Sequence, residues 1–301
     1  MRSPDPGLRP VDSHAHFWDT GRMGYPWLAD FPAISGPHTP RDLLAEAVPC
    51  VPDSIVFVQA ECERSRWLEE VEWVESLAAA EPRIGGIVAH APMDAGPATL
   101  AAINRLAARP LVRGVRHLIQ GEANPVFCLR PEFLAGIREL GRRNLTFDIC
   151  CTHGQLPAVI ELVRRCPETL FILDHGGKPA IGCEAADAWK GHIARLAAEP
   201  NLHCKLSGLG TEAPGGRWSV GDLQPYADHL LSCFGAGRVL FGSDWPVVKL
   251  AGGYRLWLEG ARQLLSHLAE DEIRAVFREN ARRVYRLGPI PCSDWTKKTP
   301  L

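Results

Sequence analysis

The sequence lacks a charge excess of one sign, and it lacks any long apolar run. Its 33 Lys and Arg residues nearly balance its 35 Asp and Glu residues, which gives a formal net charge of −2. This balance argues against a nucleic-acid partner and against binding to an anionic membrane surface. No apolar run approaches the roughly 18–20 residues that cross a bilayer, so no membrane-spanning helix is expected. The first residues, MRSPDPGLRP, contain no apolar segment of the secretory type, so we expect no secretory signal.

Paired cysteine motifs are also missing. The chain has 10 cysteines, but none forms a C-x-x-C pair, and they are scattered through segments that read as strands and helices. A disulfide framework is typical of smaller, loop-rich secreted domains rather than of a chain of 301 residues. We therefore expect reduced thiols that pack mostly as small apolar groups, and a cytoplasmic protein.

The chain does contain a regular alternation of strand-like and helix-like segments. The strand-like segments have an apolar centre and polar residues at the C-terminal end, as parallel strands buried on both faces do. Amphipathic segments with apolar residues at helical spacing lie between them, at residues 65–81, 130–143, 156–167, 186–199 and 220–235. The strand-like segments occupy residues 10–17, 54–61, 83–93, 112–120, 145–153, 169–179, 202–209 and 238–246.

Eight strands that are each followed by a helix predict a single (β/α)8 barrel of the α/β class, and the chain length suits that fold. A doubly wound open sheet is the alternative, but no G-x-G-x-x-G turn follows any strand. We expect an N-terminal extension at 1–10, the barrel at 11–289 and a C-terminal tail at 290–301. A long aromatic loop at 17–40 directly follows the first strand and is predicted to cover the pocket; it holds Trp18, Tyr25, Trp27 and Phe31.

Polar residues at the C-terminal ends of barrel strands converge on one mouth. His14 and His16, in the stretch VDSHAHFWD, are two residues apart on a strand and therefore point the same way, as metal ligands must. So many histidines at one mouth are hard to explain as packing. The other strand ends contribute Gln59, Glu61, His90, Arg116, His117, His153, His175, Lys178, Lys205 and Asp244.

Single members of this set also have structural explanations. Asp244 could cap the turn after its strand, and His153 could belong to a surface turn. Arg116 could pair with Glu61 or Glu122 instead of anchoring a substrate. These alternatives stay open for each residue taken alone.

With these residues in place, the chain resembles the amidohydrolase superfamily, whose barrels carry H-x-H on strand 1, histidines on strands 5 and 6, and an aspartate on strand 8. It is most similar to the branch that contains L-rhamnono- and L-fuconolactone hydrolases. The stretches that carry this resemblance are DSHAHFWD, VQAE, GVRHLIQ, CLRPEF, LTFDIC, QLPAVIELVRRCP, LDHGGKP, KLSGL and FGSDWP.

The resemblance implies a metal held by His14, His16, His153 and Asp244, with His175 facing the substrate beside it. Two-metal members of the superfamily bridge their ions with a lysine or glutamate on strand 4, and RGVRHLIQ offers neither. We therefore expect one divalent ion at most, and nitrogen and carboxylate ligands favour Zn2+. The branch also includes members that work without a metal, so metal dependence stays open.

The predicted function is hydrolysis of a sugar-acid lactone, a small-molecule substrate. Asp244 would take the proton from the attacking water, and His175 would stabilise the oxyanion. A lysine inside an apolar run, as in LHCKLSG, is costly unless it meets a ligand or an acid. The residues expected to bind the substrate are Arg116, His90, Lys205, Trp27, Trp245 and Glu61.

Two other functions stay open. A metal-dependent decarboxylase of an aromatic or muconate-type acid would use the same ligand set, but in an apolar slot with an arginine clamp. A non-catalytic binding barrel would keep many ionisable groups in one mouth at a high energetic cost. The polar groups on strands 2, 3, 4 and 7 favour the lactone. A homodimer is compatible with the sequence, which does not set the oligomeric state.

Overall fold

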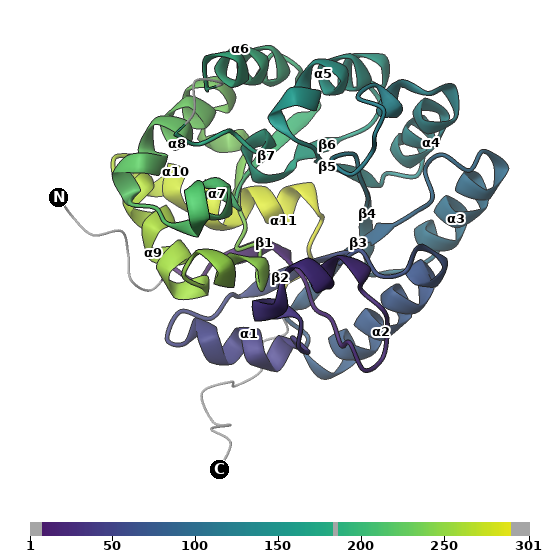
Figure 1. Cartoon of the computed structure of the whole chain (residues 1–301), viewed down its shortest axis with the longest axis horizontal. Helices are drawn as coiled ribbons and strands as arrows, with labels where there is room; N and C mark the ends of the chain where they lie inside the picture. Colours follow the sequence, from purple (N-terminus) through teal and green to yellow (C-terminus); the bar gives the residue numbers. More distant parts are fainter. Residues whose placement is uncertain (1–7, 183–185, 290–301) are drawn as a thin grey trace.

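A computed structural model describes residues 8–182 and 186–289 of the chain. At its centre lies one sheet of eight strands in the order β1 to β8 (Figure 1). The expected tail at 290–301 lies outside the described residues, as do residues 1–7 of the expected N-terminal extension. The strands are β1 (Val11–Ala15), β2 (Ser54–Val58), β3 (Ile84–His90), β4 (Val112–Leu118), β5 (Thr146–Cys150), β6 (Phe171–Leu173), β7 (Leu202–Leu206) and β8 (Val239–Phe241).

Each strand pairs in parallel with the next strand along the chain. The segment after β8 then meets the end of β1 through two backbone hydrogen bonds. His16 N donates to Trp245 O (2.7 Å), and Asp244 N donates to His14 O (2.8 Å). The sheet is therefore a nearly closed barrel, and the predicted (β/α)8 fold is confirmed.

The strands end earlier than the sequence pattern predicts. β6 ends at Leu173 and β8 ends at Phe241, so the polar residues that follow them lie in turns rather than in strands. His175, in the turn η6 (Asp174–Gly177), has a φ of 55°, and Asp244 has a φ of 60°. A positive φ does not fit an extended strand, which is why the prediction was wrong at these ends.

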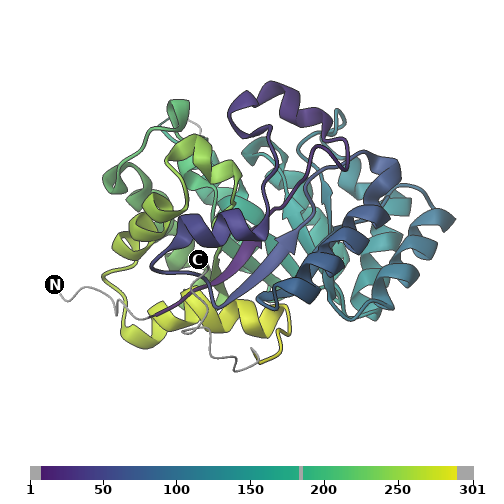
Figure 2. The ribbon, with the colours of Figure 1, turned by 90° about the horizontal axis from the view of Figure 1, so that it is seen from below.

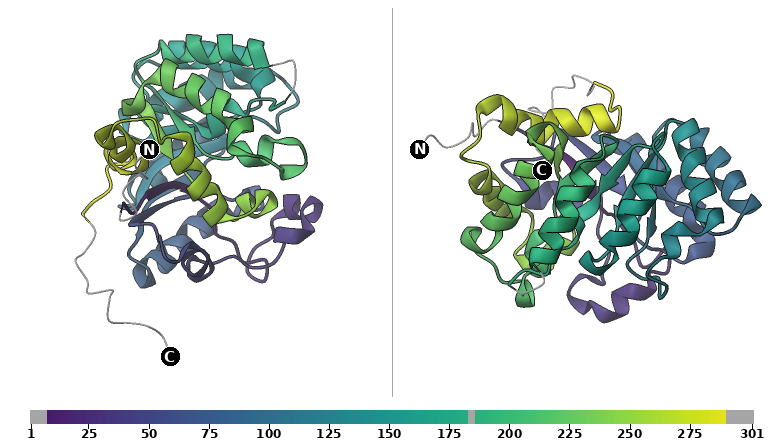
Figure 3. Two further views of the ribbon diagram at one scale, coloured as in Figure 1. Left: turned by 90° about the vertical axis from the view of Figure 1, so that its left-hand side faces the viewer. Right: turned by 90° about the horizontal axis from the view of Figure 1, so that it is seen from above.

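Helices surround the strands on all sides (Figures 1 and 3). Several helices begin with a side chain that caps their first turn. Before the helix Val220–Phe234, Ser219 Oγ accepts from Asp222 N (3.3 Å), and Asp222 Oδ2 accepts from Ser219 N (2.8 Å). No helix within the described ranges is long and apolar enough to cross a membrane. The helices are α1 (Pro40–Ala47), α2 (Trp67–Ala80), α3 (Pro97–Ala107), α4 (Pro131–Arg142), α5 (Leu156–Arg165), α6 (Ala186–Ala197), α7 (Leu209–Glu212), α8 (Val220–Phe234), α9 (Tyr254–Leu264), α10 (Glu270–Arg274) and α11 (Asn280–Val284).

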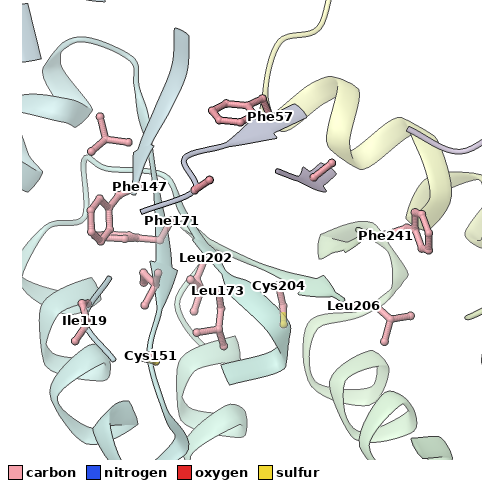
Figure 4. Close-up of a cluster of buried hydrophobic side chains, with 14 of the residues drawn as sticks. Phe57, Ile119, Phe147, Cys151, Phe171, Leu173, Leu202, Cys204, Leu206 and Phe241 are labelled. Carbon is pink, nitrogen blue, oxygen red and sulfur yellow. The ribbon is translucent and has the colours of Figure 1, made fainter. Parts of the chain in front are cut away.

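The core has two apolar clusters. The larger one contains strand residues such as Phe147 and Leu202, which are drawn in Figure 4. It also contains buried side chains of the surrounding helices. In the smaller one, Val56, Ile172 and Leu240 of three strands pack against the C-terminal segment around α11. Burial of the larger cluster holds the helices against the outside of the barrel. Burial of the smaller cluster closes the barrel at one end.

The loop between β1 and α1 lies at the opposite end of the barrel from α11 (Figure 2, purple and yellow). It contains the short turns η1 (Pro26–Asp30) and η2 (Pro32–Ile34). Trp18 is fully buried at its base, where its ring packs edge-on against Trp27 at 5.4 Å. This packing joins the loop to the larger apolar cluster of the barrel.

Candidate active site

A pocket of about 290 Å³ opens where the carboxyl ends of the strands meet the loop after β1. Polar side chains and aromatic rings share its lining, so it offers both hydrogen bonds and apolar contact. Six of the predicted site residues line it: His16, Trp27, Glu61, Arg116, His175 and Asp244. The other lining residues are Phe31, Ala60, Leu118, Gln120, Cys150, Lys178 and Val247.

Three of the predicted metal ligands lie together. His14 Nε2 and His16 Nε2 are 3.2 Å apart, and Asp244 Oδ1 lies 3.6 Å from the first and 3.3 Å from the second. The two backbone hydrogen bonds between β1 and the segment after β8 bring these side chains to one point. Two imidazole nitrogens and one carboxylate oxygen form a donor set that suits a divalent cation such as Zn2+.

His175 faces Asp244 from a third direction. Its Nε2 lies 4.0 Å from Asp244 Oδ1, while its Nδ1 lies 2.9 Å from Ser207 Oγ. Burial lowers the pKa of His175 to about 4, so the ring is neutral at physiological pH. Burial alone would raise the pKa of Asp244, but His175, His16 and His14 together hold it well below its ordinary range. Asp244 is therefore an ionised base beside three imidazoles.

The backbone around the pocket is unusual at four positions. Glu61, His175, Lys178 and Asp244 have φ angles of 54°, 55°, 48° and 60°, and all four line the pocket. Non-glycine residues with positive φ are uncommon and cost free energy unless the surrounding structure holds them. Only two other non-glycine residues in the described part of the chain have a positive φ. Backbone strain is thus concentrated where the side chains of the pocket must be aimed.

A buried ionic network lies beneath the pocket, made of Arg116, Asp148, Asp174, Lys205 and Tyr285. Lys205 Nζ lies 2.6 Å from Asp148 Oδ2 and 3.0 Å from Asp174 Oδ1, and Arg116 Nη1 lies 3.3 Å from Asp174 Oδ2. Tyr285 donates its hydroxyl hydrogen to Asp148 Oδ2 (2.6 Å). Two cations opposite two carboxylates meet the requirement that buried charges be paired.

Two sequence expectations change with this network. Arg116 pairs with Asp174 and donates to Gln59 O (2.7 Å), rather than pairing with Glu61 or Glu122. Lys205 is fully buried and meets the acids of the network, and it does not line the pocket. It therefore departs from the expected substrate contact.

Three further predicted residues, His153, His90 and Trp245, do not line the pocket. His153 follows the end of β5 in the turn η5 (His153–Gln155) and lines a separate hollow beside Lys178 and Glu212. Among the described residues, two groups of close metal-type ligands exist, His14 with His16 and Asp244 and His14 with Asp174 and His175. His153 belongs to neither group, because the chain turns away after β5. His90 packs against the ring of His117 at 5.6 Å.

Trp245 is fully buried and donates its indole N–H to Glu46 Oε2 (2.9 Å). It therefore packs behind the pocket and does not face it. Of the two tryptophans predicted to bind the substrate, Trp27 is the one that lines the pocket, and its Nε1 donates to Ala60 O (2.8 Å).

Several residues of the site are not among those that the sequence predicts. Asp148 and Asp174 are charged residues inside apolar runs, so the cost argument applied to Lys205 could have found them. Lys178 follows the turn that carries His175 and is one of the polar strand-end residues, but it is not among the predicted substrate-binding residues. Gln120 carries no charge and gave no comparable signal in the sequence.

The chain is similar to known amidohydrolases along most of its length. It is 35% identical to an L-fucono-1,5-lactonase of Burkholderia ambifaria, over 92% of this chain and 95% of that protein. It is 26% identical to an L-rhamnono-gamma-lactonase of Scheffersomyces stipitis, over 59% of this chain and 60% of that protein. A crystal structure of an amidohydrolase from Burkholderia multivorans with bound zinc matches with a TM-score of 0.84 and 31% identity, over 93% of this chain and 100% of that one. The amidohydrolase family model matches residues 11–287, and the chain therefore belongs to the amidohydrolase family.

Proposed function

We propose that this protein hydrolyses the lactone of a sugar acid. The observation that carries the proposal is the ionised Asp244 carboxylate, 3.3–4.0 Å from three imidazoles in a pocket with polar and aromatic walls. The lactonase from Burkholderia ambifaria, similar over nearly the whole chain, supports this substrate class.

Each side chain of the pocket has a role in this proposal. Asp244 takes a proton from the attacking water and returns it to the alkoxide that leaves when the ring opens. His175 and Arg116 stabilise the negative charge that develops on the carbonyl oxygen. Trp27 packs against the apolar face of the sugar, and Glu61 binds ring hydroxyls.

Residues behind the pocket act through their neighbours. Lys205 belongs to the buried ionic network, and His90 packs on His117. The indole of Trp245 donates to Glu46 and so holds the turn that carries Asp244. We therefore reassign these three residues from substrate contact to support of the site.

The proposed cofactor is one divalent ion, with Zn2+ favoured by the donor set. His14, His16 and Asp244 would hold it, because these donors fit such an ion, whereas His153 lies outside the cluster. When bound, it would polarise the ester carbonyl or lower the pKa of a water. Arg116 Nη1 lies 3.3 Å from His14 Nε2, and a guanidinium so close to a ligand atom opposes tight binding of a cation.

The decarboxylase alternative finds less support in the pocket. A decarboxylase needs an apolar slot beside its arginine clamp, whereas polar and charged side chains share the lining of this pocket with Arg116. The lining also includes Glu61, Gln120 and Lys178, which suit hydroxyl groups better than an aromatic ring.

A substrate panel tests the proposal. Purified protein is mixed with sugar-acid 1,4- and 1,5-lactones and, separately, with hydroxybenzoic and muconate-type acids. Acid release is followed with a pH indicator, and carbon dioxide is followed by coupled detection. An enzyme-free blank corrects for spontaneous ring opening. We expect acid release from at least one lactone and no carbon dioxide; carbon dioxide release without lactone hydrolysis would replace the proposal with the decarboxylase.

We also propose a cytoplasmic location and a small-molecule lactone as the partner. The free thiols of eight cysteines in the described part of the chain support a reducing compartment. The homodimer stays a prediction, which sedimentation or light scattering of the purified protein would test.

A further inference from the structure

Gln59 and Glu61 form a closed pair of hydrogen bonds just after the end of β2. Gln59 Nε2 donates to Glu61 Oε1 (2.7 Å), and Glu61 N donates to Gln59 Oε1 (2.7 Å). A backbone N–H only donates, so the side-chain atom of Gln59 that faces it is the oxygen. The nitrogen of the same amide must then face the carboxylate. The backbone of Glu61 thus fixes which way the amide of Gln59 is turned.

Gln59 supports its neighbour and does not face the pocket. Its side chain is fully buried and is not part of the pocket lining. Both backbone polar groups of Gln59 are engaged, because its N donates to Val88 O (2.8 Å) and its O accepts from Arg116 Nη2 (2.7 Å). The amide of Gln59 therefore projects from a backbone that is held on both sides.

Glu61 needs this support because its backbone is strained. Its φ of 54° lies in a region that residues with a side chain occupy only when their surroundings hold them there. One hydrogen bond from Gln59 holds the Glu61 backbone, and the other holds the Glu61 side chain. A single buried amide therefore fixes both the strained backbone and the direction of the carboxylate.

The second carboxylate oxygen, Glu61 Oε2, is left for a ligand. Glu61 lines the pocket, and within the described ranges no residue donates a hydrogen bond to Oε2 or forms an ion pair with it. A carboxylate oxygen only accepts, so the ligand group that meets it must be a donor. The ring oxygen and the carbonyl oxygen of a lactone only accept as well. A free hydroxyl is the one group of a sugar-acid lactone that meets this demand.

We propose that Gln59 is a positioning residue that directs Glu61 Oε2 toward the substrate, and that this oxygen makes the enzyme require one particular hydroxyl of the lactone. A lactone with hydrogen in place of that hydroxyl leaves Oε2 without a donor after water has been displaced, which weakens binding. The inference rests on the proposed function, and it adds which side chains select the substrate and by what group.

Lactones that differ by one hydroxyl test the selectivity. Hydrolysis of a sugar-acid lactone is compared with hydrolysis of its monodeoxy analogues, each with hydrogen in place of one hydroxyl. In the unmodified protein, kcat/KM should fall about 10- to 100-fold for one analogue, as for the loss of a hydrogen bond to a charged group. In Gln59→Leu, the hydroxylated lactone should lose a similar factor while this analogue keeps its rate, so the ratio of the two kcat/KM values should approach unity.

Two further variants separate positioning from general damage. The exchange of Gln59→Glu with Glu61→Gln keeps both hydrogen bonds, because the carboxylate at position 59 accepts from the backbone and from the amide of position 61. It leaves an amide oxygen for the substrate, so selectivity should return in part. Gln155→Leu is the matched control and should keep the full selectivity. The side chain of Gln155 also joins two strand ends, since it accepts from Thr152 N (3.0 Å) and donates to Ile119 O (2.9 Å), but it does not line the pocket.

Unchanged selectivity in a folded Gln59→Leu would overturn the inference, and so would an equal loss of kcat/KM on every lactone. If Gln59→Leu does not fold, nuclear magnetic resonance of the side-chain amide of Gln59 decides. Its hydrogens should exchange with solvent faster in Glu61→Ala than in the unmodified protein, and equal rates would overturn the inference. Hydrolysis without a preference for any hydroxyl would overturn the inference alone, whereas a complete lack of lactone hydrolysis would overturn the proposed function and the inference with it.

Discussion

Asp244 and Lys178 bring opposite charges into the same pocket, and their surroundings maintain both. Three imidazoles keep Asp244 ionised against the effect of burial. Burial alone would lower the pKa of Lys178, but Cys150, Glu212 and Asp244 raise it above its ordinary value. A neutral lactone in the pocket therefore lies beside a base, Asp244, and a cation, Lys178. The carboxylate of the product lies beside the same cation. This pairing of charges suits ester hydrolysis better than it suits a passive binding pocket.

The role of Lys178 leads to a prediction about substrate binding. Its ammonium group pairs with Glu212 at 3.4 Å, which leaves further N–H groups for a substrate oxygen. Replacing it in Lys178→Met removes one charged hydrogen bond, worth about 1.5–3 kcal/mol, so kcat/KM should fall about 10- to 100-fold. Steady-state kinetics on the best lactone measure this change. Lys190→Met, on α6 outside this pocket, should leave kcat/KM as in the unmodified protein; equal values in both variants would contradict the role.

At the scale of elements, the end of β2 is held by the helix after it and by the loop after β1. Glu70 of α2 is fully buried, and its Oε1 accepts from Ala60 N (3.1 Å). Trp27 of η1 donates to the carbonyl oxygen of the same residue. The next residue, Glu61, is thereby held beside the pocket in its strained backbone conformation, with a φ of 54°. The loop, strand end and helix form one unit around a single residue, Ala60.

Burial of Glu70 leads to a prediction about stability and pH. Burial raises the pKa of its carboxyl from 4.5 to about 8, so the folded protein holds a proton there that the unfolded chain gives up. The stabilisation is complete below pH 4.5 and is lost as the pH rises through 8. Relative to Glu70→Gln, the unmodified protein should lose up to roughly 1.4 kcal/mol per pH unit in this window.

Denaturant unfolding of both proteins at pH 5 and pH 8 measures this difference. Glu132→Gln, at an exposed position in the first turn of α4, is the control and should show no such pH dependence. A constant difference between Glu70→Gln and the unmodified protein across the window would show that Glu70 does not hold the proton.

The C-terminal segment around α11 is the second element with a specific role. It closes the barrel opposite the pocket and sends Tyr285 into the buried ionic network, where its hydroxyl donates to Asp148. Tyr285→Phe keeps the ring but removes this buried hydrogen bond, so the free energy of unfolding should fall by about 1–3 kcal/mol.

Thermal and denaturant unfolding check this prediction against a matched change. Tyr25→Phe removes a buried hydroxyl that makes no hydrogen bond in the structure, so it should cost little or even stabilise the protein. A Tyr285→Phe variant as stable as Tyr25→Phe would mean that the hydrogen bond to Asp148 contributes nothing.

At the scale of the whole molecule, the barrel explains which parts of the site a sequence can reveal. The alternation of strand-like and helix-like segments predicts all eight strands. The carboxyl ends of parallel strands lie at the same end of the barrel, which brings His14, His16 and Asp244 together at one mouth. The direction in which a turn leads is not encoded in that alternation. His153, three residues past the end of β5, is carried away from the cluster for this reason.

Depth inside the barrel is the other quantity that the sequence does not give. Lys205 lies inside β7, one residue before its end, and Trp245 lies beyond the end of β8. Lys205 nevertheless pairs with Asp148 and Asp174, and Trp245 donates to Glu46. Which acid a buried cation meets depends on strand stagger and side-chain direction across the barrel. These are properties of the closed sheet rather than of any one strand.

The role of Asp244 as the base is tested most directly by kcat/KM of Asp244→Asn on the best lactone, measured beside the thermal midpoint of this variant. The amide cannot accept the proton of the attacking water, so kcat/KM should fall by about 100- to 10,000-fold. The thermal midpoint should stay close to that of the unmodified protein, because the amide fills the same space. Undiminished hydrolysis by a folded Asp244→Asn would contradict the account, since no other carboxylate reaches the three imidazoles from the pocket in the described part of the chain.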